Sequence, residues 1–155
     1  MSEQSCIFCK IVSGEVPSYK IWESDTHIAF LSIYPNTEGV TVVIPKKHFS
    51  SYAFQMQDED LFSLIKAAKE VALLLDKKLQ VGRTAMVFEG LGVNHVHAKL
   101  FPLHGTSPDG EWKQAHSSEE KQKEYFELYQ GYVSSHDCTV VSHEELLRTA
   151  RKITE

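Results

Sequence analysis

The chain has 155 residues, is 42% hydrophobic and 24% charged, and carries 16 Lys+Arg against 21 Asp+Glu, a formal net charge of −5. This length suits one compact domain with its own core, so we expect residues 1–155 to form a single domain. The acidic balance argues against broad binding of nucleic acid or of an anionic membrane surface.

The apolar runs and the cysteines of the sequence indicate a cellular compartment. The longest apolar run, residues 71–75, is too short to span a bilayer. The N-terminus lacks the basic and apolar parts of a secretory signal. Three cysteines, an odd number, indicate a reduced compartment without a disulfide framework. We therefore expect a cytoplasmic protein.

The apolar pattern predicts a short helix, three strands, a long helix, two strands and two final helices. In chain order these elements cover residues 6–13, 19–23, 27–33, 40–44, 58–79, 84–88, 95–101, 119–130 and a helix opened by Ser142. The long helix is the clearest, because apolar residues recur at three- and four-residue spacing. Short links between strands indicate a mostly antiparallel sheet with helices packed on it, an α+β fold.

The segment 94–100, Asn-His-Val-His-Ala-Lys-Leu, is the strongest chemical signal. Alternate side chains of a strand share a face, so we expect His95, His97 and Lys99 on one face and an apolar row on the other. Two imidazoles and an ammonium in a row form an anion-binding surface with a nucleophile or general acid near pH 7. The alternative is the polar, solvent-facing side of an edge strand.

A Cys-x-x-Cys pair, Cys6 and Cys9, lies near the N-terminus. Such a pair is typical of a metal clamp, but a tetrahedral Zn²⁺ needs two further ligands. His48, just past the strand over 40–44, and His95 are the candidates. A redox pair is the competing interpretation, although a thioredoxin-like pair follows a strand inside a βαβ unit.

Four blocks of the sequence, taken in order, resemble the histidine triad (HIT) family. These blocks are residues 6–17, 29–35, 39–48 and 95–100. The resemblance covers residues 6–104 and leaves 105–155 as a C-terminal extension with two helices. It implies an α+β homodimer that binds purine nucleotides and hydrolyses or transfers nucleotidyl groups. Family substrates include nucleoside phosphoramidates, dinucleoside polyphosphates and adenylated adducts.

The resemblance also implies roles for single residues. The family's nucleophile corresponds to His97, which forms a covalent nucleotidyl-histidine, with His95 and Lys99 assisting. In several zinc-bearing bacterial members the first motif histidine completes a zinc site. That structural zinc site corresponds here to Cys6, Cys9, His48 and His95. The apolar slot for the base corresponds to Ile7, Phe8, Phe30 and Ile33.

Four positions depart from the family pattern. Lys99 replaces the third histidine, and an ammonium does not reproduce the donor and acceptor of a neutral imidazole. Ser32 replaces the acid that binds the ribose hydroxyls, and Phe88 replaces an asparagine. The phosphate-binding segment is shortened to Gly90-Leu91-Gly92, which keeps the backbone N–H groups of its two glycines for an anion.

These departures leave two functions open. Each lost transition-state donor typically costs about 10²–10³ in rate. The first function is a nucleotide hydrolase or nucleotidyltransferase that acts through His97. The second is a zinc-stabilised nucleotide-binding protein with little or no turnover.

Overall fold

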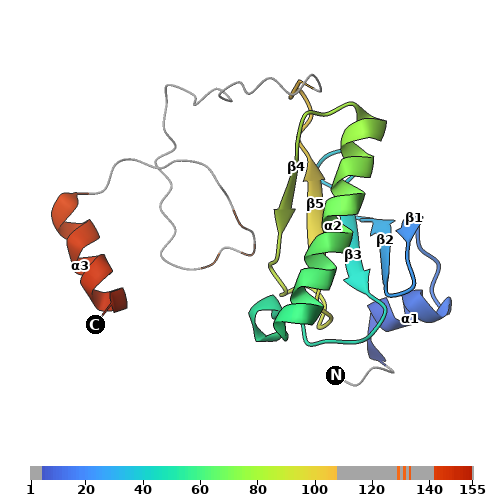
Figure 1. The fold of residues 1–155 in the computed structure, drawn as a ribbon, viewed down its shortest axis with the longest axis horizontal. Helices are drawn as coiled ribbons and strands as arrows, with labels where there is room; N and C mark the ends of the chain where they lie inside the picture. The colour runs from blue at the N-terminus through green and yellow to red at the C-terminus, as the bar shows by residue number, and fades with distance from the viewer. Residues whose placement is uncertain (1–4, 108–128, 130, 132, 134–141, 155) are drawn as a thin grey trace. The chain divides into compact units, whose positions relative to one another are not determined.

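The computed structural model describes residues 5–107, 129, 131, 133 and 142–154 (Figure 1). The chain divides into two compact units, Met1–Glu111 and Trp112–Glu155, and each is described by itself. No helix in the described ranges is long and apolar enough to cross a membrane.

The second unit contributes one described helix, α3 (His143–Thr154). It begins directly after Ser142, as the capping-box spacing predicts. The other helix predicted for this region, over 119–130, lies outside the described residues apart from Tyr129. Cys138 also lies outside them.

The first unit is built on one five-stranded antiparallel sheet with the strand order β1-β2-β3-β5-β4. The strands are β1 (Lys20–Glu23), β2 (His27–Leu31), β3 (Thr41–Pro45), β4 (Thr84–Val87) and β5 (Ala98–Pro102). Two α-helices accompany this sheet in the first unit, so the predicted α+β class is confirmed. The crossover from β3 to β4 through a helix leaves a place between these two strands, and β5 fills it.

The two faces of the sheet carry separate apolar clusters, because alternate strand residues point to opposite faces. One cluster joins β2, β3 and β5 to the long helix α2 (Asp58–Leu79), which Figure 1 shows running along the sheet. The other cluster joins β2 and β3 to the N-terminal helix α1 (Ile7–Ser13) through Phe8 and Cys6. The site residues lie on the α1 side.

Both helices have ends that the sequence explains. α1 ends at Gly14, whose φ of 82° is the left-handed conformation that glycine adopts without strain. α2 carries acidic residues in its first turn and Lys77 and Lys78 in its last, matching the helix dipole. A short 3-10 helix, η2 (Ala53–Gln55), precedes α2.

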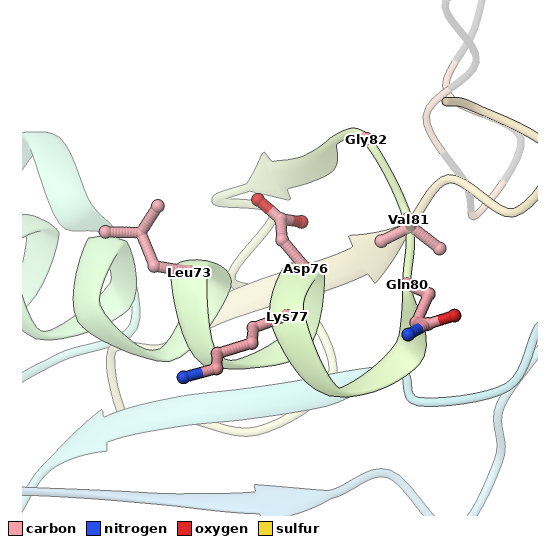
Figure 2. A pocket seen from close by; sticks show the side chains of 6 residues that line it. All are labelled: Leu73, Asp76, Lys77, Gln80, Val81 and Gly82. Carbon is pink, nitrogen blue, oxygen red and sulfur yellow. The ribbon is translucent and has the colours of Figure 1, made fainter. Parts of the chain in front are cut away.

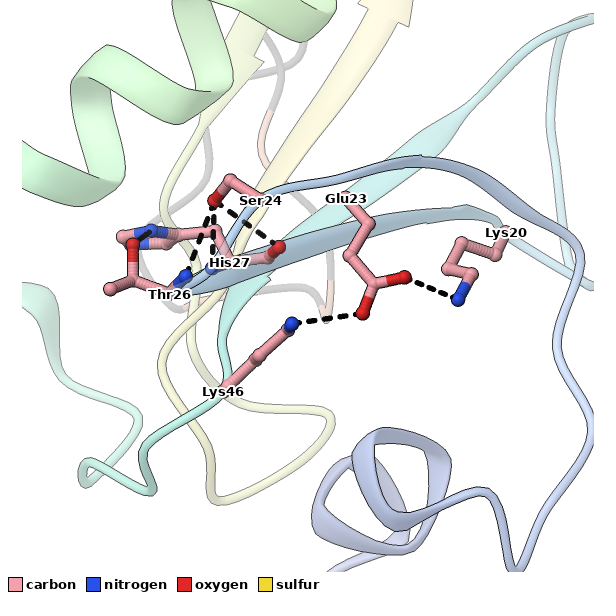
Figure 3. A network of polar contacts seen from close by, with 6 residues as sticks. All are labelled: Lys20, Glu23, Ser24, Thr26, His27 and Lys46. Atoms are coloured by element: carbon pink, nitrogen blue, oxygen red, sulfur yellow. Dashed lines mark hydrogen bonds and ion pairs between the residues drawn. The ribbon is translucent and has the colours of Figure 1, made fainter.

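Figure 3 shows how the β1–β2 hairpin is tied to the end of β3. The Ser24 hydroxyl accepts a hydrogen bond from the His27 N–H at 3.1 Å and closes the turn. Lys46, directly after β3, pairs with Glu23 at 2.8 Å, and Lys20 pairs with the same carboxylate. Lys20 and Lys46 together lower the pKa of Glu23 to about 2. The end of β3, which leads into the site, is thereby tied to its neighbours.

The strand predicted over 95–101 is shorter and starts at Ala98. The reason is that the preceding backbone bonds elsewhere: the Val96 N–H donates to the Phe49 carbonyl at 3.1 Å, and the His95 N–H donates to the Val93 carbonyl at 2.8 Å. The alternation of sides still extends upstream of the strand. Val96 packs in the cluster with α2, whereas His95 and His97 contact Phe8 on the α1 side.

Candidate metal centre and active site

The four predicted metal ligands, Cys6, Cys9, His48 and His95, lie together with their ligand atoms within 4.8 Å of one another. His95 Nδ1 is 3.5 Å from Cys6 Sγ and 3.6 Å from Cys9 Sγ. His48 Nδ1 is 3.3 Å from Cys9 Sγ. The ligands come from three segments far apart in the sequence: the start of α1, the loop after β3 and the approach to β5.

His95 is oriented by its second ring nitrogen. Its Nε2–H donates to the Pro45 carbonyl at 2.9 Å, and a carbonyl only accepts, so Nδ1 keeps its lone pair and points at the two sulfurs. Zinc-binding histidines use their other N–H in this way. Two thiolates and two imidazole nitrogens are a standard tetrahedral zinc set. The donors and their orientation therefore fit Zn²⁺.

Two loops are fastened together to bring His48 and His95 into contact. The Asn94 side-chain oxygen accepts from the Ser51 N–H at 3.1 Å. Gly90 sits against the same backbone with φ 74°, and a Cβ there would lie 2.6 Å from the Ser51 carbonyl oxygen. Gly90 thus permits the close approach of the two loops.

His97 is the second imidazole of the motif and is 3% exposed. Its Nδ1–H donates to the His95 carbonyl at 2.7 Å, and its ring forms a T-shaped pair with Phe8 at 5.3 Å between ring centroids. Burial lowers the pKa of His97, while the hydrogen bond to the His95 carbonyl acts in the opposite direction. Within the described part of the chain, Nε2 has no hydrogen-bond partner. A neutral imidazole with its lone pair on Nε2 is the form that attacks an electrophile.

Lys99 is paired with an acid that the sequence analysis did not identify. Its Nζ donates to Glu89 Oε2 at 3.0 Å, and the two side chains are 35% and 15% exposed. Lys99 stands opposite Val87, the last residue of β4. The signal that would have found this acid is the antiparallel β4–β5 register, because it brings the residues just after Val87 near Lys99.

The residues implied for the base slot divide into buried and exposed groups. Phe8 and Phe30 are buried and meet edge to face at 5.5 Å. Ile7 and Ile33 are exposed, the latter by 68%. The Ser32 hydroxyl accepts from the Tyr34 N–H at 3.2 Å. Phe8 also contacts both motif imidazoles, so it supports the site by packing.

The shortened glycine segment also divides into two environments. Gly90 contacts the Ser51 backbone, whereas an added Cβ at Gly92 would meet no atom within 4 Å. Gly92 is exposed. Close packing therefore explains why position 90 is a glycine, but it does not explain the glycine at position 92.

A cavity of about 390 Å³ lies at the C-terminal end of α2, away from the predicted site residues (Figure 2). Leu73, Asp76, Lys77, Gln80, Val81 and Gly82 line it. The Asp76 carboxylate accepts from the Thr84 hydroxyl at 2.7 Å and so ties α2 to β4. The acid in this cavity thus has a structural partner.

Comparisons with known proteins give the family. A HIT domain model matches residues 13–106, more than half of the chain. An uncharacterized HIT-like protein of Methanocaldococcus jannaschii is 39% identical, covering 68% of this chain and 83% of the relative. An adenosine 5'-monophosphoramidase of Schizosaccharomyces pombe is 37% identical, covering 63% and 74%.

Solved structures agree with these sequence matches. A zinc-bound histidine triad family protein of Mycobacterium smegmatis superposes with a TM-score of 0.62 at 26% identity, covering 70% of this chain and 87% of that one. Its fold is the α+β fold described above. The chain belongs to the HIT family.

Proposed function

We propose that the protein hydrolyses a purine nucleotide conjugate, or transfers its nucleotidyl group, with His97 as the nucleophile. The observation that carries this proposal is the setting of His97: the ring is buried, burial lowers its pKa, and its Nδ1–H is bonded to the His95 carbonyl, which leaves Nε2 for the substrate. The Schizosaccharomyces pombe relative is named an adenosine 5'-monophosphoramidase. An adenosine phosphoramidate is therefore the first substrate to test.

The chemistry runs in two displacements. His97 Nε2 attacks the α-phosphorus in line, and the bond from phosphorus to the leaving nitrogen breaks as the Nε2–phosphorus bond forms. The leaving amine takes the electron pair and a proton from solvent. The imidazole becomes cationic, which strengthens its Nδ1–H hydrogen bond to the His95 carbonyl. Water then displaces the nucleotide from Nε2 and regenerates the neutral ring.

His95 supports this reaction without touching the substrate. Both of its ring nitrogens have partners, one at the sulfurs and one at the Pro45 carbonyl. We assign it to the metal site together with Cys6, Cys9 and His48. These four residues would hold a zinc ion, which would link the three segments that carry them. The backbone carbonyl of His95 orients His97, so the metal site and the nucleophile are mechanically connected.

The remaining assignments follow the family. Ile7 and Ile33 are exposed and Phe8 and Phe30 are buried against each other, and we assign these four apolar residues to the face of a purine. Lys99 supplies a positive charge for the phosphate, and the N–H groups of Gly90 and Gly92 are further donors. We propose a homodimer and a cytoplasmic location, with residues 6–104 carrying the site.

A second function is favoured by one observation. The Lys99 ammonium is already paired with Glu89 at 3.0 Å, so part of its charge is neutralised before a phosphate arrives. Weak stabilisation of the transition state would leave a zinc-stabilised nucleotide-binding protein without useful turnover.

The decisive experiment follows adenosine 5'-phosphoramidate by ³¹P NMR and the protein by rapid-quench mass spectrometry. Hydrolysis with an adenylyl adduct that disappears in His97→Ala supports the nucleophile assignment. His104→Ala is the matched control, because His104 is exposed and bonds the Glu38 carbonyl instead. Unchanged hydrolysis by His97→Ala would contradict the proposal. Nucleotide binding without hydrolysis would favour the second function.

A further inference from the structure

The Glu89–Lys99 ion pair is the feature of the site that the mechanism above does not use fully. A lone lysine would give the phosphate site a charge of +1. Here the ammonium is held at 3.0 Å by a carboxylate that is only 15% exposed, so the pair is close to neutral. An acid beside a phosphate site repels the ligand and needs an explanation.

The ion pair lies on the same side of the sheet as His97. Lys99 stands directly opposite Val42, so the two side chains share a face, and Val42 packs in the α1-side cluster with Phe8, whose ring contacts His97. A phosphorus atom bonded to His97 Nε2 would therefore lie within reach of both. The site meets an incoming phosphoryl group with one positive charge and one negative charge.

We propose that Glu89 is a specificity-determining residue that selects a phosphoryl group with one negative charge over a group with two. The inference rests on the proposed function. Repulsion from the Glu89 carboxylate scales with the charge of the ligand, so it weakens binding of a dianion about twice as much, in free energy, as binding of a monoanion.

This selection has two chemical consequences. A phosphoramidate has a single negative charge at phosphorus, whereas the free nucleotide released by hydrolysis is largely dianionic above pH 7, since the second phosphate pKa is about 6. Glu89 thus favours the substrate over its product and speeds product release.

The test is a series of binding measurements with ligands that the protein does not hydrolyse. Calorimetry at pH 8 measures three ligands: adenosine without phosphate, the methyl ester of adenosine 5'-monophosphate with one charge, and adenosine 5'-monophosphate with two. The proteins are the wild type, Glu89→Gln, Lys99→Gln, the double variant, and Glu59→Gln as a control acid in the first turn of α2.

The affinity for adenosine 5'-monophosphate should follow the charge of the pair. We expect roughly a tenfold gain in Glu89→Gln, roughly a tenfold loss in Lys99→Gln, and a value near the wild type in the double variant, the size of one unit charge at a partly exposed site. The methyl ester should change about threefold in the same directions, the square root of tenfold. Adenosine should bind all five proteins equally, and Glu59→Gln should match the wild type.

The proposal is overturned if Glu89→Gln binds the dianion no better than the wild type, or gains equally for all three ligands. If Glu89→Gln does not fold, the double variant compared with Lys99→Gln measures the same removal of the carboxylate. Failure of the proposed function is separate, because it shows as turnover that survives in His97→Ala. Absence of binding by the wild type would overturn both.

Discussion

His95 and His97 stand two residues apart, are both buried and both form a T-shaped contact with Phe8, yet their ring nitrogens have different partners. His95 uses both nitrogens, one toward Cys6 and Cys9 and one toward the Pro45 carbonyl. His97 uses one, toward the His95 carbonyl. A backbone carbonyl thus fixes the tautomer of each ring, and the geometry of the other nitrogen decides what chemistry it offers.

The comparison separates a structural half of the site from a reactive half. The structural half is the proposed metal site, whose four side chains come from three segments. The proposed reactive half is His97 with the Glu89–Lys99 ion pair. The two halves meet at the hydrogen bond from His97 Nδ1–H to the His95 carbonyl. A variant in one half should therefore leave the function of the other half intact.

The largest expected effect comes from replacing each of the two histidines in turn. His97→Ala should lower hydrolysis of an adenosine phosphoramidate by about 10³-fold or more, since it removes the nucleophile. It should keep one zinc per chain. His95→Ala should instead lose zinc. Metal analysis beside a hydrolysis assay checks both, and zinc loss in His97→Ala would show that the halves are not separable.

Cys6→Ser breaks the structural half alone. Cys6 is buried, and loss of one thiolate leaves zinc with an incomplete set of ligands. We expect substoichiometric zinc and a melting temperature lower by roughly 5 °C or more, since each kcal/mol lost costs about 2–4 °C in a chain of this size. Cys138→Ser, outside the predicted ligand set, should keep the zinc content of the wild type. A zinc-free protein with a reversible Cys6–Cys9 disulfide would favour the redox interpretation.

The clustering of Cys6, Cys9, His48 and His95 could be predicted because the sequence signals for these residues are local. A Cys-x-x-Cys pair, a histidine after a buried strand and the motif histidine each sit at the end of an element whose existence the apolar pattern indicates. Residue types with a strong preference for one metal then leave few alternatives. The long helix and the positions of the strands along the sequence were predictable for the same reason.

The reactive half was less predictable because it depends on register and loop contacts. The Glu89–Lys99 pair requires knowing that Val87 faces Lys99. The start of β5 at Ala98 requires knowing that Val96 bonds to Phe49. Neither pairing has a local signal, since each is set by how two distant segments meet.

Gly90 and Gly92 test how tightly the loop between the two halves of the site is packed. Gly90→Ala should lower the free energy of unfolding by about 1–3 kcal/mol, because φ is 74° and the new Cβ would lie 2.6 Å from the Ser51 carbonyl oxygen. Gly92→Ala should change it by less than about 0.5 kcal/mol, since nothing lies within 4 Å. Urea unfolding measures both. Equal effects would mean that the close approach at Ser51 does not constrain the loop.

His27 tests whether burial alone keeps an imidazole neutral in this fold. It begins β2, is 4% exposed and lies outside both halves of the site. Burial lowers its pKa below 6.5, and Asp60 opposes this. Below pH 6.5 the unfolded chain therefore binds this proton more readily than the folded chain, so the stability that neutral His27 provides is present above that pH and is lost as the pH falls.

The measurement is the urea midpoint of the wild type and of His27→Gln at pH 7.5 and pH 5.5. Both proteins contain the same proposed metal ligands, so any effect of pH on those ligands cancels when the change in urea midpoint between the two pH values is compared. The variant should lose less stability than the wild type over this interval, whatever its stability at pH 7.5. An equal loss would mean that folding does not displace the His27 pKa. Burial would then be insufficient to explain a neutral ring, and the neutrality of His97 would have to come from its particular neighbours.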